Sequence, residues 1–385
     1  MDRMLKIALL LLMSCPSYAS DHGFALSLYH RLAASEKGNI FFSPHSISAA
    51  LTMTYAGAGG RTASQMASAL RLGGDAHAAC RDLAVSLDEA AKLGNIEFRV
   101  ANALWGQKGF GFKKSFLELT ERYYDAGLHE MDFKRDSEGA RKTINTWVEG
   151  KTAERIRDLI GPGVLDAMTR LVLTNAIYFK GDWAAQFKED STAEEDFQLG
   201  GGRTARVPMM RQTREFRYLE VPGLQALELP YAGERLSMLI LLPPEGELKA
   251  LESELDEGTL AGWIKGMRRK KVRVQLPRFK ASSGFRLDSV LKAMGMRDAF
   301  SVKSADFSGM DGKKDLYIGA VLHKAFVDVN EQGTEAAAAT AVSMVQKAAS
   351  APPPQFRADR PFLYLIRDAK TGAILFMGRL ADPRA

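Results

Sequence analysis

Residues 331–356 are the stretch whose residue types and spacing point to a function. Their pattern fits the addition of a strand to a β-sheet. The stretch joins two strand-like runs, residues 318–330 and 362–366. Every second residue is uncharged and none is a proline in the set Thr334, Ala336, Ala338, Thr340, Val342 and Met344. In a strand these six side chains would share one face, which could be buried without stranding a charge. A short alanine helix and an inert Ala/Pro linker are the simpler alternatives.

Motifs for catalysis are missing from the sequence. It has no Gly-x-Ser-x-Gly elbow, no His-Glu-x-x-His, no glycine loop for phosphate and no cysteine and histidine spacing typical of a metal site. The six histidines are scattered, so a triad assembled from distant residues stays open. We expect that the protein is not an enzyme, with no catalytic residue, metal or cofactor.

The segment 331–340, Glu-Gln-Gly-Thr-Glu-Ala-Ala-Ala-Ala-Thr, resembles the reactive-loop hinge of serpins, the serine protease inhibitors. Similar family patterns recur from Ser43 to the C-terminus, so the sequence is identified as a member of this family, of the bacterial inhibitory type. The resemblance implies an α+β fold with three β-sheets, about eight or nine helices and an exposed reactive-centre loop at about 331–356. It also implies a suicide substrate, whose cleaved loop inserts into the main sheet before water can release the acylated serine protease.

The family's usual spacing, counted from the hinge, places the scissile bond between Lys347 and Ala348. Counting back from residues 359–362 instead places it after Ala348. We prefer Lys347, because the hinge side sets the inserted length and because lysine suits the specificity pocket of trypsin-like proteases. The alternatives are an elastase- or subtilisin-directed inhibitor cleaved at Ala348 or Val345, and a non-inhibitory serpin that acts as a binding or chaperone-like module.

The resemblance further assigns residues to the moving parts of the fold. The hinge consists of Glu331, Gly333, Thr334, Ala336, Ala338 and Thr340. A polar cluster under the point where the sheet opens consists of Ser43, Ser46, Asn175 and His323. A gate at the top of the sheet consists of Glu331 and Arg278 beside Trp183. Considered alone, His323 would be a hydrogen-bonded core histidine and the Glu331 and Arg278 pair a surface salt bridge.

Residues 1–19 have the features of a secretory signal peptide: basic Arg3 and Lys6, an apolar run too short to span a membrane, and small residues before Ser20. Residues 20–385 then form a single domain, which we expect to be monomeric and secreted or periplasmic. Residues 12–15 resemble a bacterial lipobox, so lipid anchoring through Cys15 is the alternative. Without Cys15, only Cys80 remains, and no intramolecular disulfide can form.

The formal net charge of +6 over so long a chain is weak support for a polyanion partner, and we expect no nucleic acid partner. The densest basic run consists of Lys265, Arg268, Arg269, Lys270, Lys271 and Arg273. A polyanion site at 265–273 is one interpretation. A solvated sheet edge guarded by charge is the favoured one.

Periodicity and turn signals predict most of the secondary structure. Helices are predicted at 21–34, 44–57, 77–92, 114–125, 137–160 and 286–296, with a further one opened by a capping box at 62–65. Strands are predicted at 40–42, 96–104, 170–179, 226–229, 236–242, 271–279, 318–329, 362–366 and 373–378. The continuously apolar run 170–179 is predicted to be central in a sheet and covered on both faces, with the helix 137–160 as one cover.

Overall fold

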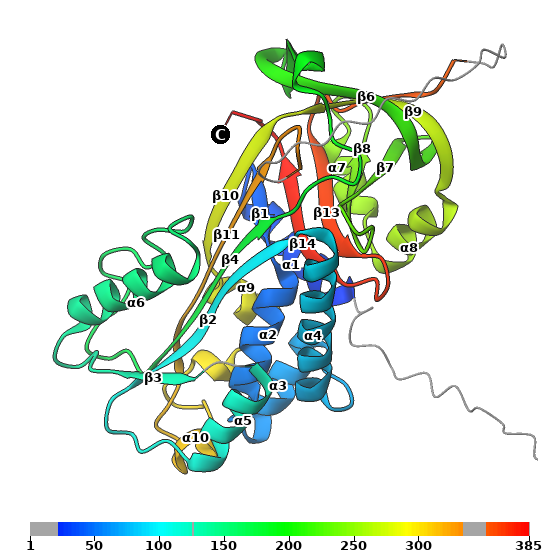
Figure 1. Cartoon of the computed structure of the whole chain (residues 1–385). Coiled ribbons are helices and arrows are strands. Elements are labelled where there is room, and N and C mark those ends of the chain that lie inside the picture. Colours follow the sequence, from blue (N-terminus) through cyan, green and yellow to red (C-terminus); the bar gives the residue numbers. More distant parts are fainter. Residues whose placement is uncertain (1–21, 125–126, 334–351, 385) are drawn as a thin grey trace, which may run out of the picture.

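The computed structural model describes residues 22–124, 127–333 and 352–384, which form an α+β fold (Figure 1). Its ten α-helices are α1 (His22–Ser35), α2 (Pro44–Tyr55), α3 (Gly60–Leu70), α4 (Ala76–Gly94), α5 (Lys114–Tyr124), α6 (Ser137–Lys151), α7 (Leu248–Glu254), α8 (Glu257–Gly266), α9 (Asp288–Ala293) and α10 (Ser308–Asp311). The small excess over the expected eight or nine reflects short elements such as the four-residue α10. None of the helices in these described ranges is long and apolar enough to cross a membrane.

The strands of the described chain form two hydrogen-bonded sheets. The larger has nine strands in the order β1-β14-β13-β8-β7-β6-β9-β12, with β5 paired to β6. These strands are β1 (Ile40–Phe42), β5 (Ala193–Gly200), β6 (Arg203–Val221), β7 (Leu224–Pro230), β8 (Leu236–Leu242), β9 (Arg268–Pro277), β12 (Gln355–Arg357), β13 (Phe362–Asp368) and β14 (Ile374–Leu380). Two sheets are found instead of the expected three because of β6, which is 19 residues long. It pairs with β5 and β9 along one part and with β7 along another, so it links β5, β9 and β12 to the strands from β7 to β1 in one sheet.

The smaller sheet has five strands in the order β10-β11-β4-β2-β3. These are β10 (Phe279–Arg286), β11 (Ile318–Val329), β4 (Leu171–Lys180), β2 (Glu97–Gln107) and β3 (Leu128–Met131). β4 and β11 are parallel, whereas β4 is antiparallel to β2 and β11 is antiparallel to β10. We call the β4–β11 junction the seam, because it is the parallel junction between two antiparallel pairs, β2–β4 and β10–β11.

The central strand β4 is covered on both faces, as its apolar run predicts. Val172 and Ala176 belong to one apolar cluster with residues of α6, while Leu171 and Leu173 belong to another with residues of α2. The alternation follows from the two-residue period of a strand. Figure 1 shows α6 on one side of the sheet and α2 on the other. Both helices therefore pack on the strand that borders the seam.

Two helix predictions are wrong in their boundaries. α3 begins at Gly60, with Gly59 as its N-cap and no side-chain cap, so the predicted capping box does not open it. Its two residues bind distant backbone instead: the Thr62 hydroxyl accepts a hydrogen bond from Asp306 N, and the Gln65 amide oxygen accepts from Asp298 N. The two side chains therefore form tertiary hydrogen bonds instead of the local capping box.

The predicted helix 137–160 ends at Lys151, as α6. Ala153 and Glu154 then adopt left-handed conformations with φ of 48° and 59°, which turn the chain back. Ile160 is held against α6 through its backbone, which exchanges hydrogen bonds of 2.9 and 3.0 Å with the Asn145 side chain. The apolar pattern continued past the helix because this returning segment is buried on the same sheet face.

Candidate functional site

A row of polar side chains crosses the smaller sheet at one level. His323 of β11 is the register partner of Asn175 of β4, and Asn175 is the register partner of Asn102 of β2. His323 is fully buried and Asn175 is 1% exposed, on strands that are otherwise largely apolar. The pair His323 and Asn175 spans the seam, so any separation of β4 from β11 must break their contact.

The ring of His323 is held by one hydrogen bond at each nitrogen. Ser43 N donates to Nε2 at 3.1 Å, so Nδ1 carries the proton and donates to the side-chain oxygen of Asn175. Burial lowers the pKa of His323 to about 3, so the imidazole is neutral at physiological pH. The Ser43 hydroxyl donates to Leu375 O at 2.6 Å, which ties this point to β14 of the other sheet.

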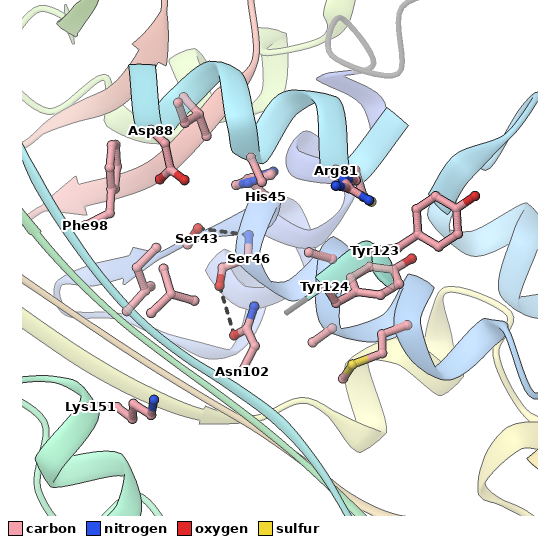
Figure 2. Close-up of a pocket in the computed structure, with 18 of the residues that line it drawn as sticks. Ser43, His45, Ser46, Arg81, Asp88, Phe98, Asn102, Tyr123, Tyr124 and Lys151 are labelled. Carbon is pink, nitrogen blue, oxygen red and sulfur yellow. Dashed lines mark hydrogen bonds between the residues drawn. The ribbon is translucent and has the colours of Figure 1, made fainter. Parts of the chain in front are cut away.

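α2 supplies the floor of the row. Ser43 is its N-cap and accepts a hydrogen bond from Ser46 N at 3.1 Å, and Pro44 follows at the first helical position, as the sequence predicts. Asn175 Nδ2 donates to Ser46 Oγ at 2.6 Å, and Ser46 Oγ donates to Asn102 Oδ1 at 3.2 Å. Figure 2 shows Ser43, Ser46 and Asn102 lying one after another. The structure thus brings together the four predicted residues of the cluster, whose role in sheet opening stays a prediction.

Asn102 is a member of this network that the sequence analysis missed. It accepts hydrogen bonds from both Ser46 and Asn175. The signal was present, because Asn102 interrupts the apolar run from Ala101 to Trp105 with an amide that needs a buried partner.

The second grouping is the gate, at the end of β11 where the chain leaves the sheet. The carboxylate of Glu331, which is 3% exposed, accepts hydrogen bonds from Arg278 Nη2 at 2.5 Å and from the Thr192 hydroxyl at 2.6 Å. Burial alone would raise the pKa of Glu331, but these donors outweigh it and lower the pKa. Because the carboxylate is buried, this pair differs from the exposed salt bridge of the simpler interpretation, although Arg278 itself is 46% exposed.

Trp183 fixes the backbone of the gate. Its backbone N–H donates to Gln332 O at 2.9 Å, its indole N–H donates to Asn330 O at 3.0 Å, and its ring stacks on Tyr231 with centroids 4.6 Å apart. Gly333 forms a bridge with Asp182 at a φ of 141°. A Cβ at Gly333 would lie 2.3 Å from the carbonyl oxygen of Gly181, so only glycine fits this close approach.

The other predicted loop residues, namely Thr334, Ala336, Ala338, Thr340, Lys347 and Ala348, lie outside the described residues, as do the signal peptide and Cys15. The structure describes the chain up to Gly333 and again from residue 352, with β12 pairing to β9 in parallel. Both ends of the predicted reactive loop are therefore anchored: one beside the seam and the other on the larger sheet.

The basic run lies on the C-terminal turn of α8 and the first part of β9. β12 pairs with β9 only from Arg273 to Gln275, so the preceding residues of β9 form a free edge lined by exposed cations. This fits the predicted guarded edge, and a polyanion partner stays a prediction. No group of three or more metal-ligating side chains occurs among the residues that the structure describes.

Comparison with known proteins gives one consistent family. The family model described as "Serpin (serine protease inhibitor)" matches residues 19–383. The chain is 44% identical to serpin B6 of Macaca fascicularis over 94% of this chain and 97% of that protein. It is 42% identical to human leukocyte elastase inhibitor over the same shares. The structure of human thyroxine-binding globulin bound to thyroxine superposes with a TM-score of 0.87 at 30% identity, covering 96% of this chain and 99% of that one.

This match corrects the argument by which the sequence was expected not to encode an enzyme. That expectation was based on missing catalytic motifs. Their absence alone does not decide whether a chain is an enzyme. The family model instead describes its members as serine protease inhibitors.

The gate yields a prediction about Gly333. Gly333→Ala is expected to lower stability by about 2 kcal/mol or more, because the new methyl group meets backbone atoms and the φ is unfavourable for alanine. Thermal and urea unfolding of the purified protein measure the loss. Gly38→Ala is the matched control, since a Cβ there meets nothing within 4 Å. Equal stability of the two variants would contradict the close-packed gate.

The neutral His323 yields a prediction about pH. Its folded pKa of about 3 lies below the unfolded value near 6.5, so the stability it contributes is present above pH ~6.5 and is lost as pH falls toward 3. His323→Gln, which keeps hydrogen-bonding atoms but cannot titrate, should flatten the fall of melting temperature between pH 6.5 and 4.5. A residual slope is expected from His45, whose pKa burial lowers to about 4. An unchanged slope in the variant would contradict the assignment.

Proposed function

The chain belongs to the serpin family, and from this premise we propose that it inhibits serine proteases as a suicide substrate, with residues 331–356 as the bait. The observation that carries the proposal is the direction of the strands at the seam. β4 and β11 are parallel neighbours, and the chain leaves β11 at the gate. A segment that turned back from this end between them would run antiparallel to both strands, which is the ladder that a short return connection permits.

The inserting segment suits such a slot. Its alternate residues from Thr334 onward are uncharged and include no proline, so one face could be buried and every backbone N–H could donate. About ten net new backbone hydrogen bonds at roughly 1 kcal/mol each would favour insertion by on the order of 10 kcal/mol. The uncut protein is then metastable, and inhibition depends on insertion being faster than release of the acylated protease.

The side chains at the scissile bond suggest the class of protease. We propose cleavage after Lys347 by trypsin-like proteases, whose specificity pocket carries an acidic group that suits a cation. A second candidate is cleavage after Ala348 by an elastase- or subtilisin-like protease. It is favoured by the relatives named leukocyte elastase inhibitor, such as the human protein at 42% identity.

The competing function is a binding module whose loop is cut without trapping. It is supported by the likeness to thyroxine-binding globulin, a protein of this fold solved with bound thyroxine. The two functions differ in what remains after contact with a protease, because only an inhibitor keeps the protease covalently attached.

We also propose that the protein is exported through residues 1–19, with lipidation of Cys15 as the alternative route. Mass spectrometry of the protein from its own cells separates the two routes, since a lipidated chain would begin at Cys15 and a freely secreted one at Ser20.

The proposal predicts a covalent adduct. The protein is mixed separately with trypsin, elastase and subtilisin, and the products are resolved on denaturing gels. We expect a boiling-resistant band at the summed mass with trypsin and a released peptide that begins at Ala348. A peptide that begins at Ala349 would move the bond to follow Ala348. Clean cleavage without an adduct for all three proteases would contradict inhibition.

A hinge variant separates insertion from simple cleavage in the same assay. Thr334→Arg places an unpaired cation on the predicted buried face, and it should turn the inhibitor into a plain substrate, with cleavage retained and the adduct lost. Glu335→Arg is the matched control, because residue 335 lies on the opposite face of the same predicted strand. Unchanged trapping by Thr334→Arg would contradict the insertion mechanism.

A further inference from the structure

A pocket of about 380 Å³ lies on the α6 face of the smaller sheet, at the end of β4 that leads to the gate. One wall is the sheet, and the other belongs to residues 152–160 after α6, which we call the return segment. The lining consists of Glu97 of β2, Tyr178 and Lys180 of β4, and Ala153, Glu154, Arg155 and Arg157 of the return segment. The pocket therefore joins the sheet to a segment that lies outside its helices and strands.

The pocket carries an excess of positive charge. Its lining has three cations and two carboxylates, a net charge of +1. One carboxylate, Glu97, also pairs with Arg99, a cation outside the lining. The pair of Arg157 and Glu154 has side chains that are 65% and 74% exposed, so either partner is readily exchanged for another. In the chain as described, the Lys180 ammonium forms no hydrogen bond or ion pair with another residue.

Strained backbone positions the cations of the return segment. Ala153, Glu154 and Asp158 have φ of 48°, 59° and 49°, and they are half of the six non-glycine residues with a positive φ in the described ranges. Such conformations cost energy and cluster at ligand sites. The Arg155 guanidinium lies 5.7 Å from the centroid of the Tyr178 ring. Contact with a ring uses the face of a guanidinium, whereas an oxyanion binds its N–H edge, so the two contacts are compatible.

The return segment also lies over the seam. Lys324 Nζ of β11 donates to Arg157 O at 2.8 Å, while Arg155 contacts Tyr178 of β4. Tyr178 and Phe326 of β11 are register partners across the seam, with ring centroids 5.9 Å apart. A strand that entered the seam would lie between these two rings, and its side chains on this face would need the space beneath the return segment. The segment must then lift, which separates its arginines from the sheet.

From these observations we propose that the pocket binds a small polyvalent oxyanion of the phosphate class, either inorganic or carried by an organic molecule. Arg155 and Arg157 bind it from the return segment and Lys180 from the sheet. Arginine forms charge-assisted, bidentate hydrogen bonds with phosphate oxygens, and lysine adds a point charge. A diphosphate has enough oxygens for all three side chains, whereas a single carboxylate has only two.

Binding is coupled to sheet opening, because the oxyanion ties the return segment to β4. The site is complete only while the segment lies on the closed sheet, so the ligand has differential affinity for that state and stabilises it. It therefore slows loop insertion and leaves cleavage of the loop unaffected. This consequence depends on the proposed inhibitory function, whereas the binding itself does not.

The test of binding titrates the full chain with sodium pyrophosphate in a calorimeter, with ionic strength held constant by sodium chloride. Amide hydrogen exchange, followed by mass spectrometry, reports on the return segment in the same samples. We expect one pyrophosphate to bind each chain and to slow exchange within residues 152–160. Absence of heat overturns the site. Heat without protection of this segment places the oxyanion on another basic surface, such as residues 265–273, and also overturns it.

ADP, titrated in parallel, distinguishes an inorganic ligand from a phosphorylated organic one. Tighter binding of pyrophosphate assigns the pocket to a free phosphate, and tighter binding of ADP assigns it to a phosphorylated molecule. Either preference supports the site when exchange in residues 152–160 slows.

Three variants locate the ligand. Lys180→Gln should weaken pyrophosphate about tenfold, since it removes one charged donor. Glu97→Gln should strengthen it about threefold, since it removes a carboxylate from the lining. Lys142→Gln is the control, because it removes an exposed cation of α6 that is not part of the lining. Equal affinities of Lys180→Gln and Lys142→Gln, or a weaker affinity of Glu97→Gln, would overturn the assignment.

The coupling is tested with the protease assay. Saturating pyrophosphate should lower the yield of covalent adduct at least twofold and raise the yield of cleaved free protein, with the rate of loop cleavage unchanged. Binding without any change in this partition overturns the coupling. If the protein forms no adduct even without pyrophosphate, the proposed function fails, while calorimetry and hydrogen exchange still decide the binding site.

Discussion

The rest of the structure depends on the seam between two parallel strands. β4 and β11 each complete an antiparallel pair on their outer side, so their own contact is the one place in the smaller sheet where a segment returning from β11 would fit antiparallel to both neighbours. Without such a segment, the backbone groups of β4 and β11 at the seam pair with each other in one ladder. An inserted strand would form two ladders there, one with each strand. The gate, the polar row and the helices packed on β4 all bear on whether that contact holds.

Two kinds of side-chain contact hold it, and they differ in chemistry. The row joins His323 to Asn175 with neutral groups that are fully buried, so breaking it exposes unsatisfied donors and acceptors before new partners arrive. The gate uses a buried carboxylate, Glu331, whose Arg278 partner is half exposed. Loss of that partner would leave a buried charge uncompensated. A barrier made of hydrogen bonds and one ion pair can be crossed. A fully apolar junction of interlocked side chains would resist separation of the two strands more strongly.

Much of this could be predicted from the sequence where the signal is local or periodic. The apolar run of β4, the Ser43 cap with Pro44 behind it, and the residues of the polar cluster and gate were all predicted, the last two through the family resemblance. Two of the failures share a cause. Thr62 and Gln65 form a capping box by pattern but bind residues more than 200 positions away. Asn102 visibly interrupts an apolar run, but its partner Asn175 follows only from the strand register. Such contacts depend on which elements become neighbours in the fold, and local sequence carries no record of that. The end of α6 was missed because a buried irregular segment has the same apolar content as a helix.

The measurement that tests the central claim most directly compares the melting temperature of the intact protein with that of the protein cut once within residues 334–351 by a non-serine protease. If the closed seam is metastable and the cut loop enters it, the cleaved protein should melt at least about 15 °C higher, in line with an insertion free energy on the order of 10 kcal/mol. Far-ultraviolet circular dichroism should also report added strand. A cleaved protein that melts at the same or a lower temperature would contradict the account. The closed seam would then already be the most stable state of the sheet.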